Sequence, residues 1–145
     1  MIALIQRVSS ASVTVKHKNI GQISTGILAL IGVQKQDDEH KADKLLKKIL
    51  NYRIFADEQQ RMNLSLLDIQ GGLLLVPQFT LAADTAKGLR PGFSTAALPD
   101  DGKRLFDYLL QQAQSQYKSV SCGLFGADMQ VSLVNEGPAT FWLET

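Results

Sequence analysis

Several features on which many enzymes depend are missing from this 145-residue sequence. It has one cysteine, Cys122, and two histidines, His17 and His40, so it contains neither a Cys-x-x-Cys pair nor a His-Glu-x-x-His motif. Transition-metal sites commonly use those spacings. The glycine-rich fingerprints of nucleotide sites, G-x-G-x-x-G and G-x-x-x-x-G-K-[ST], are absent too. We therefore expect no metal site and no cofactor.

The sequence also has no obvious general base, which serine and cysteine hydrolases need. His17 lies in a polar turn, and His40 lies on the polar side of an amphipathic segment, so we expect both to be exposed. Cys122 has no cluster of basic residues beside it and is expected to be a buried packing residue. The usual catalytic combinations are therefore not expected.

Charge of one sign and long apolar runs are lacking as well. Fifteen Lys and Arg residues against 14 Asp and Glu leave a net charge of +1, so any RNA contact must come from a local patch. The longest apolar stretch, Gly26 to Val33, is far shorter than the roughly 20 residues that span a bilayer. The short apolar opening, with Arg7 after it, does not fit a signal peptide. We expect one cytoplasmic domain over residues 1–145, with no membrane partner.

Hydrophobic periodicity predicts a mixed α+β fold that is mostly sheet, with two helices packed on one side. Strands are predicted at Ile2–Val8, Ala11–Val15, Ile20–Ser24, Gly26–Val33 and Leu73–Val76, and from Met129 to Leu133, resuming at Ala139 to Leu143. The first helix begins at Asp37-Asp38-Glu39 and buries Ala42, Leu45, Leu46, Ile49 and Leu50. The second begins near Pro99 and buries Leu105, Phe106, Leu109, Leu110 and Ala113.

Two segments are unusual enough to be candidate sites. In the first, a strand ends in Gln78-Phe79-Thr80 and is followed by a loop with Lys87 and Arg90. Such a segment could present backbone N–H groups and a basic patch. The spacing alone favours a threonine packed at a strand end, and a solvated loop explains Lys87 and Arg90 equally well. The second segment is 135–138, Asn-Glu-Gly-Pro, which also suits a simple turn.

Several segments, in order along the chain, resemble D-aminoacyl-tRNA deacylase. They are the opening Met-Ile-Ala-Leu-Ile-Gln-Arg-Val, Tyr52-Arg-Ile-Phe with Met62-Asn-Leu, Gln78-Phe-Thr-Leu-Ala-Ala-Asp-Thr, Arg90-Pro-x-Phe-Ser, Ala127-Asp-Met-Gln-Val-Ser-Leu and Gly137-Pro-x-Thr-Phe-Trp-Leu. The resemblance extends from Met1 to Leu143.

The resemblance implies a barrel-like, mostly antiparallel fold in an intertwined cytoplasmic homodimer whose active sites lie at the subunit interface. Members of the family hydrolyse the ester that joins a D-amino acid, or glycine, to the 3′ end of tRNA. By this resemblance, Gln78, Phe79 and Thr80 form the catalytic wall. Their backbone N–H groups would stabilise charge on the carbonyl oxygen, and the 2′-hydroxyl of the tRNA would assist the attacking water.

The same resemblance implies a selectivity element that comes from the other subunit. Gly137-Pro138 matches the family's Gly-cisPro motif, which one subunit inserts into its partner's site to exclude L side chains. Arg7 matches the arginine that orients this motif. Phe125 and Met129 match residues of the pocket for the terminal adenine.

The sequence departs from the family pattern at Pro77, where the family has serine before Gln-Phe-Thr. Proline removes a hydroxyl and a backbone N–H group, and it restricts φ. A smaller departure is Gly126, where many relatives carry alanine. The alternative interpretation is therefore a tRNA- or DNA-binding protein of the same fold in which Pro77 has weakened catalysis.

Overall fold

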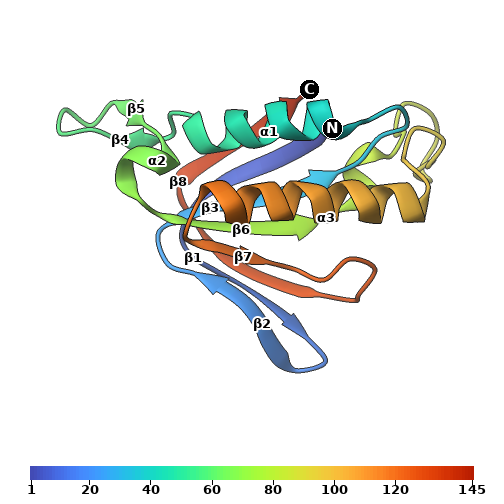
Figure 1. Cartoon of the computed structure of the whole chain (residues 1–145), viewed down its shortest axis with the longest axis horizontal. Coiled ribbons are helices and arrows are strands. Elements are labelled where there is room, and N and C mark those ends of the chain that lie inside the picture. Colours follow the sequence, from blue (N-terminus) through green and yellow to red (C-terminus); the bar gives the residue numbers. More distant parts are fainter.

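The computed structural model describes residues 1–145 and is organised around one curved, six-stranded sheet (Figure 1). Its strands are β1 (Ile2–Val15), β2 (Lys18–Ile23), β3 (Gly26–Gly32), β6 (Gly72–Pro77), β7 (Val120–Cys122) and β8 (Gln130–Glu144). The order is β2-β1-β3-β6-β7, and β8 pairs with the other edge of β1. A small hairpin joins β4 (Phe55–Ala56) to β5 (Met62–Leu64). The helical elements are α1 (Glu39–Asn51), α2 (Leu66–Ile69), α3 (Pro99–Gln116) and the 3-10 turn η1 (Phe79–Ala82).

The prediction of two separate strands at the N-terminus was wrong, because β1 is one strand of 14 residues. The exposed pair Ser9-Ser10, which interrupts the apolar pattern, marks a shift in the register between β1 and β8. Ala3 and Ile5 belong to the main core, whereas Val8, Ala11 and Val13 belong to a second, smaller core. Because of this irregularity, odd-numbered side chains face one side of the sheet before Ser9 and the other side after Ser10, and the strand can bend.

The bend brings the far end of the sheet close to closure, as the barrel-like prediction requires. The Ser121 hydroxyl of β7 donates to the carbonyl oxygen of Gln22 in β2 at 3.0 Å. Gly21 lies so close to β7 that a Cβ there would be 2.8 Å from the carbonyl oxygen of Cys122. Inside the curve, Leu28, Leu74 and Val76 pack with the bent half of β1. Most pairings are antiparallel, while β3 with β6 and β6 with β7 are parallel.

The two predicted helices lie side by side on the opposite face of this sheet (Figure 1). All five predicted core residues of α1 are buried, and the Asp38 side chain accepts the N–H of Lys41 at the helix N-terminus. In α3, four of the five predicted residues are buried; Leu110 is only partly buried, and Gly102 is buried in addition. Arg104 of α3 pairs with Glu39 of α1 at 3.0 Å. The short α2 was not predicted.

At the C-terminus, the predicted interruption at 135–138 is a register shift rather than an end of pairing, and β8 continues through it. Leu133, predicted to be inward-facing, is 36% exposed. None of the helices combines the length and the apolar character that a membrane-crossing helix needs.

The start of α1 depends on a buried carboxylate. Asp37 is fully buried and accepts hydrogen bonds from the Met1 ammonium at 2.7 Å, the Gln34 N–H at 2.7 Å and Lys41 Nζ at 3.1 Å. We predict that Asp37→Ala lowers the free energy of unfolding by about 3–5 kcal/mol, because it leaves a buried ammonium without its partner. Asp38→Ala, which removes only the exposed N-cap, should cost about 1 kcal/mol. Urea denaturation measures both, and equal losses would contradict the prediction.

Candidate active site

A cavity of about 440 Å³ opens at the edge of the sheet where β6 ends. Its walls come from the end of β6 and the start of η1, from the first turns of α3, and from the loop between β7 and β8. The lining residues are Ile31, Val33, Val76, Pro77, Gln78, Phe79, Ala97, Leu98, Pro99, Gly102, Phe106, Phe125, Gly126, Ala127, Met129 and Val131. Five residues singled out from the sequence, Pro77, Gln78, Phe79, Phe125 and Met129, therefore line one cavity.

The backbone turns sharply at Gln78, and several hydrogen bonds hold this turn. The Gln78 N–H donates to the carbonyl oxygen of Ile31 in β3 at 2.7 Å, and its own carbonyl accepts the Leu81 N–H at 3.2 Å. Its side-chain amide donates to the Thr80 hydroxyl. Pro77 is the last residue of β6 and lies beyond the last residue pair of β6 with β7, Leu75 with Cys122, so proline interrupts no pair of that ladder. The turn is thus compatible with proline at this position.

The turn leaves two backbone donors beside the cavity, which Gln78 and Phe79 line and Thr80 directly follows. The N–H groups of Phe79 and Thr80 begin η1, and the first N–H groups of a helical turn have no partner within it. The Thr80 side chain is exposed, and its hydroxyl is hydrogen-bonded to Gln78 rather than to a basic group. Chemically, this arrangement can stabilise a negative charge on an oxygen atom, and it supplies no general base to activate the hydroxyl.

Aromatic rings shape both the mouth and the interior of the cavity. Phe79 is 60% exposed at the mouth, and its ring centroid lies 5.2 Å from that of Phe93. In the interior, Phe125 packs against Phe106 with centroids 6.3 Å apart. Gly102 faces this ring, because a Cβ there would lie 3.4 Å from Phe125 Cζ. Neither Phe93 nor Gly102 was predicted to be a site residue from the sequence. Only the position of Phe93 in the Arg90-Pro-x-Phe-Ser segment pointed to it.

The remaining predicted residues form a separate group. Arg7 donates from Nε to the carbonyl oxygen of Glu136 at 2.9 Å, and from Nη1 to that of Ile54 at 2.6 Å. The next peptide bond, Gly137–Pro138, is cis, and Gly137 has φ +126°. Arg7 and Glu136 border a larger, polar cavity of about 770 Å³. The arginine therefore holds the backbone that leads into Gly137-Pro138.

Within one chain these two groups lie toward opposite ends of the sheet. Arg7 is opposite Ile27 on β3, and Ile27 is opposite Leu73 on β6, whereas Pro77 is opposite Ile31. Four residues of strand correspond to about 13 Å along the strand direction, with two strand spacings across the sheet in addition. A single chain does not bring Gly137-Pro138 to the cavity that Gln78 and Phe79 line.

The other candidate catalytic residues lie outside both groups. His17 and His40 are exposed, as predicted. Cys122 is partly rather than fully buried, and burial, with a smaller contribution from Asp107, raises the pKa of its thiol. A raised pKa keeps the thiol neutral and weakly nucleophilic at neutral pH. No three His, Cys, Asp or Glu side chains gather in a way that could hold a metal ion.

Comparison with known proteins shows the family to which the chain belongs. The model of the D-Tyr-tRNA(Tyr) deacylase family matches residues 4–144. The chain belongs to the D-Tyr-tRNA(Tyr) deacylase family. It is 60% identical over 145 residues to the D-aminoacyl-tRNA deacylase of Stutzerimonas stutzeri strain A1501, and the match covers all of both chains. It is also 60% identical over 144 residues to the D-aminoacyl-tRNA deacylase of Pseudomonas putida strain KT2440, covering 99% of each.

Two solved structures are similar to this member of the deacylase family. One, titled c-Myc DNA unwinding element binding protein, superposes with a TM-score of 0.96 at 37% identity and covers 100% of this chain and 99% of its own. The other, titled a probable eukaryotic D-amino acid tRNA deacylase, has a TM-score of 0.85 at 17% identity, with 99% and 98% coverage. The second likeness concerns the fold alone. The first combines the same fold with a name that refers to DNA.

The contact between Arg7 and Gly137 gives a direct test of how Arg7 and the Gly137-Pro138 segment fit together. A Cβ at Gly137 would collide with Arg7 Nη2, and φ +126° is unfavourable for an L residue. We predict that Gly137→Ala lowers the free energy of unfolding by about 2–3 kcal/mol. Gly88→Ala is a matched control, because φ is +74° there and no atom lies within 4 Å of the new Cβ. It should cost about 1 kcal/mol by denaturant unfolding, and an equal loss at both sites would count against the contact.

Proposed function

We propose that this chain hydrolyses the ester bond of D-aminoacyl-tRNA, and of glycyl-tRNA, to release the amino acid and free tRNA. The observation that carries the proposal is the pair of backbone donors at Phe79 and Thr80 beside an apolar cavity. Membership of the family supports the same reaction. The substrate is a cytoplasmic molecule, so the cytoplasm is the proposed compartment.

The chemistry required is modest, because an aminoacyl ester is already activated. Water attacks the ester carbonyl carbon, the ribose oxygen leaves with a proton, and the carbonyl oxygen carries negative charge in between. Hydrogen-bond donors aimed at that oxygen typically lower the activation free energy by a few kcal/mol. In this proposal the N–H groups of Phe79 and Thr80 are those donors, the Gln78 side chain maintains the turn, and the 2′-hydroxyl of the terminal ribose assists the water. The Thr80 hydroxyl is not the nucleophile.

The apolar interior of the cavity suits the terminal base of the tRNA. Phe125 and Met129 line it, and aromatic stacking is the common way in which proteins hold an unpaired base. The Met129 sulfur accepts the Leu124 N–H at 3.3 Å, which fixes the loop on this side. We assign Phe125 and Met129 to binding the adenine and give them no chemical step.

Chiral selectivity is assigned to Gly137 and Pro138 of a partner subunit. This assignment is supported by their distance from Gln78 within one chain, and by the two carbonyl contacts with which Arg7 orients the segment. A homodimer also offers cover for β8, on which Val134 is 57% and Trp142 is 50% exposed. Backbone atoms at the position of an L side chain would reject it without contacting a D side chain.

A binding protein without hydrolysis is the second candidate, favoured by Pro77 and by the DNA-related title of one structural relative. One experiment separates the two: deacylation of D-tyrosyl-tRNA and L-tyrosyl-tRNA by the purified protein in the presence of EDTA. We expect hydrolysis of the D-ester alone. Tight tRNA binding with no hydrolysis, and hydrolysis restored by Pro77→Ser, would instead establish the binding protein.

The role of Arg7 is tested through selectivity. Lysine keeps the charge but cannot donate to two separate carbonyl oxygens from one planar group. We predict that Arg7→Lys raises hydrolysis of L-tyrosyl-tRNA relative to D-tyrosyl-tRNA by about tenfold, equivalent to about 1.4 kcal/mol. Lys47→Arg, on the exposed face of α1, is the control and should leave the ratio unchanged. A variant with reduced activity on the D-ester and an unaltered ratio would assign Arg7 to folding alone.

A further inference from the structure

The loop between η1 and α3 extends directly from the proposed active site and has no role in the reaction described above. It begins at Asp84, four residues after Thr80, and two backbone hydrogen bonds between Asp84 and Gly92, of 2.8 and 2.9 Å, close it into a hairpin. Its return arm then carries Phe93, the ring that packs on Phe79. The base of this hairpin is therefore joined to the cavity mouth by the chain itself on one arm and by Phe93 on the other.

The tip of the hairpin has an unusual surface. Lys87 and Arg90 are exposed, and neither takes part in an ion pair or a side-chain hydrogen bond, in a chain with four salt bridges elsewhere. Leu89, between them, is fully exposed. The Asp84 carboxylate, the hairpin's own acid, accepts the Ala86 N–H at 2.9 Å. Asp84, at the base of the hairpin, keeps its negative charge, but neither cation at the tip forms an ion pair with it.

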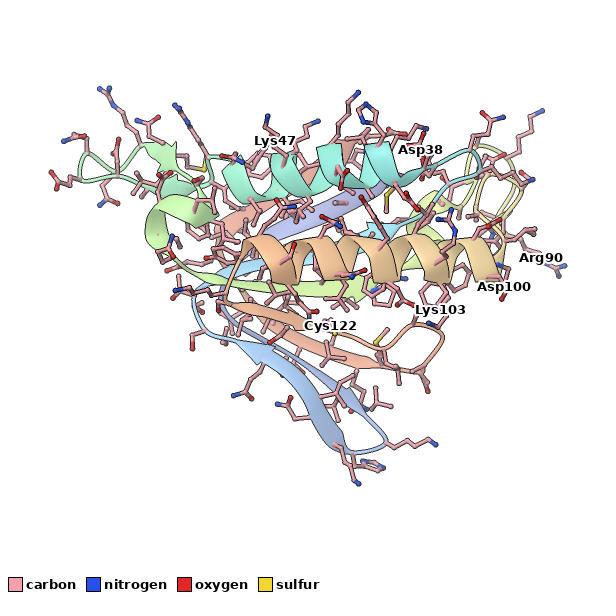
Figure 2. All side chains as sticks on the ribbon, viewed as in Figure 1. Asp38, Lys47, Arg90, Asp100, Lys103 and Cys122 are labelled. Atoms are coloured by element: carbon pink, nitrogen blue, oxygen red, sulfur yellow. The ribbon has the colours of Figure 1, made fainter.

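The surroundings limit where a negatively charged partner can lie. Figure 2 shows Arg90 projecting at the outer end of the molecule, the end at which α3 begins with Asp100 in its first turn. Asp100 and Asp101 are both exposed in the first turn of that helix. A phosphate would be repelled over this turn and attracted over the hairpin, so an anionic strand that leaves the cavity would follow the hairpin.

From these observations we propose that Lys87 and Arg90 bind backbone phosphates of the tRNA 3′ end, next to the nucleotide held in the cavity. This proposal rests on the proposed function. Lys87 is seven residues after Thr80, and seven residues of extended chain reach at most about 23–25 Å, so the tip lies within a few nucleotides of the cavity mouth. The overall charge of +1 provides no general attraction for RNA. A local basic patch such as this one must therefore provide the electrostatic attraction.

The test removes the two charges and measures their coupling to salt. We expect Lys87→Gln/Arg90→Gln to raise the KM for D-tyrosyl-tRNA about tenfold at 0.1 M salt, with kcat unchanged. The slope of log kcat/KM against log salt should become shallower by about 1–2, the change expected for two lost phosphate contacts. Hydrolysis of 2′(3′)-O-D-tyrosyl-adenosine, which has no phosphate, should be unchanged.

A matched control comes from α1. Lys44→Gln/Lys47→Gln removes the same charge from two exposed residues without a salt bridge, on a helix that does not line the cavity (Figure 2). It should leave both KM and the salt slope close to the wild-type values. An equal change in this control would overturn the proposal in favour of general electrostatics. Loss of activity of the loop variant on the adenosine ester would also overturn it, because the loop would then act on the site itself.

Two further outcomes separate this proposal from its rivals. If wild-type protein binds vesicles of phosphatidylcholine and phosphatidylserine, and the loop variant loses this binding while its KM for tRNA is unchanged, the patch serves a lipid surface and the proposal is wrong. If wild-type protein hydrolyses neither D-tyrosyl-tRNA nor the adenosine ester, the proposed function itself fails. Wild-type hydrolysis of both substrates with an unchanged loop variant refutes only the role of the loop.

Discussion

The change of face along β1 is the constraint on which the rest of this structure depends. Up to Ile5 the strand packs under α1 and α3, and from Val8 onward it packs inside the curved end of the sheet. One strand therefore serves two cores, pairs with β8 along its length and pairs with β3 and β2 in turn. Because Arg7 comes just before the change of face, its side chain lies at the end of the helix-covered region, where it reaches both Ile54 and Glu136.

The second constraint is the end of β6. Its parallel pairing with β3 stops at Pro77, and the Gln78 N–H makes one last hydrogen bond to Ile31. The chain then leaves the sheet in a short 3-10 turn, which exposes donors that a continuing strand would have used. Active sites commonly lie at the carboxyl ends of parallel strands for this reason. Here the same edge also receives the first turns of α3 and the loop after β7, which close the cavity around the donors.

These two constraints place the halves of the proposed site toward opposite ends of the sheet. The half with donors and an apolar slot belongs to the end of β6, and the half with Arg7 and Gly137 belongs to the middle of β1 and the stretch of β8 beside it. In the proposed mechanism, this separation makes selectivity depend on a second subunit, so an isolated chain would have the chemistry without the element that excludes L side chains. The basic hairpin adds a third element on the side of the donors, where the body of the tRNA leaves the cavity in that proposal.

The sequence by itself determined what depends on local pattern. The five buried residues of α1, most of those of α3 and the doubly buried strand β3 follow from periodicity, because a helix or strand must place its apolar side chains on its buried faces. The resemblance of the motifs also identified the segments around Gln78 and Gly137. The continuity of β1 through Ser9-Ser10 did not follow, because an exposed polar pair looks the same in a bulge and in a break.

Only the tertiary structure decided that Pro77, Phe125 and Met129 share a cavity, that Phe93 packs on Phe79, and that Arg7 holds the carbonyl of Glu136. These are contacts between residues far apart in sequence, set by sheet pairing and curvature, and no local periodicity encodes them.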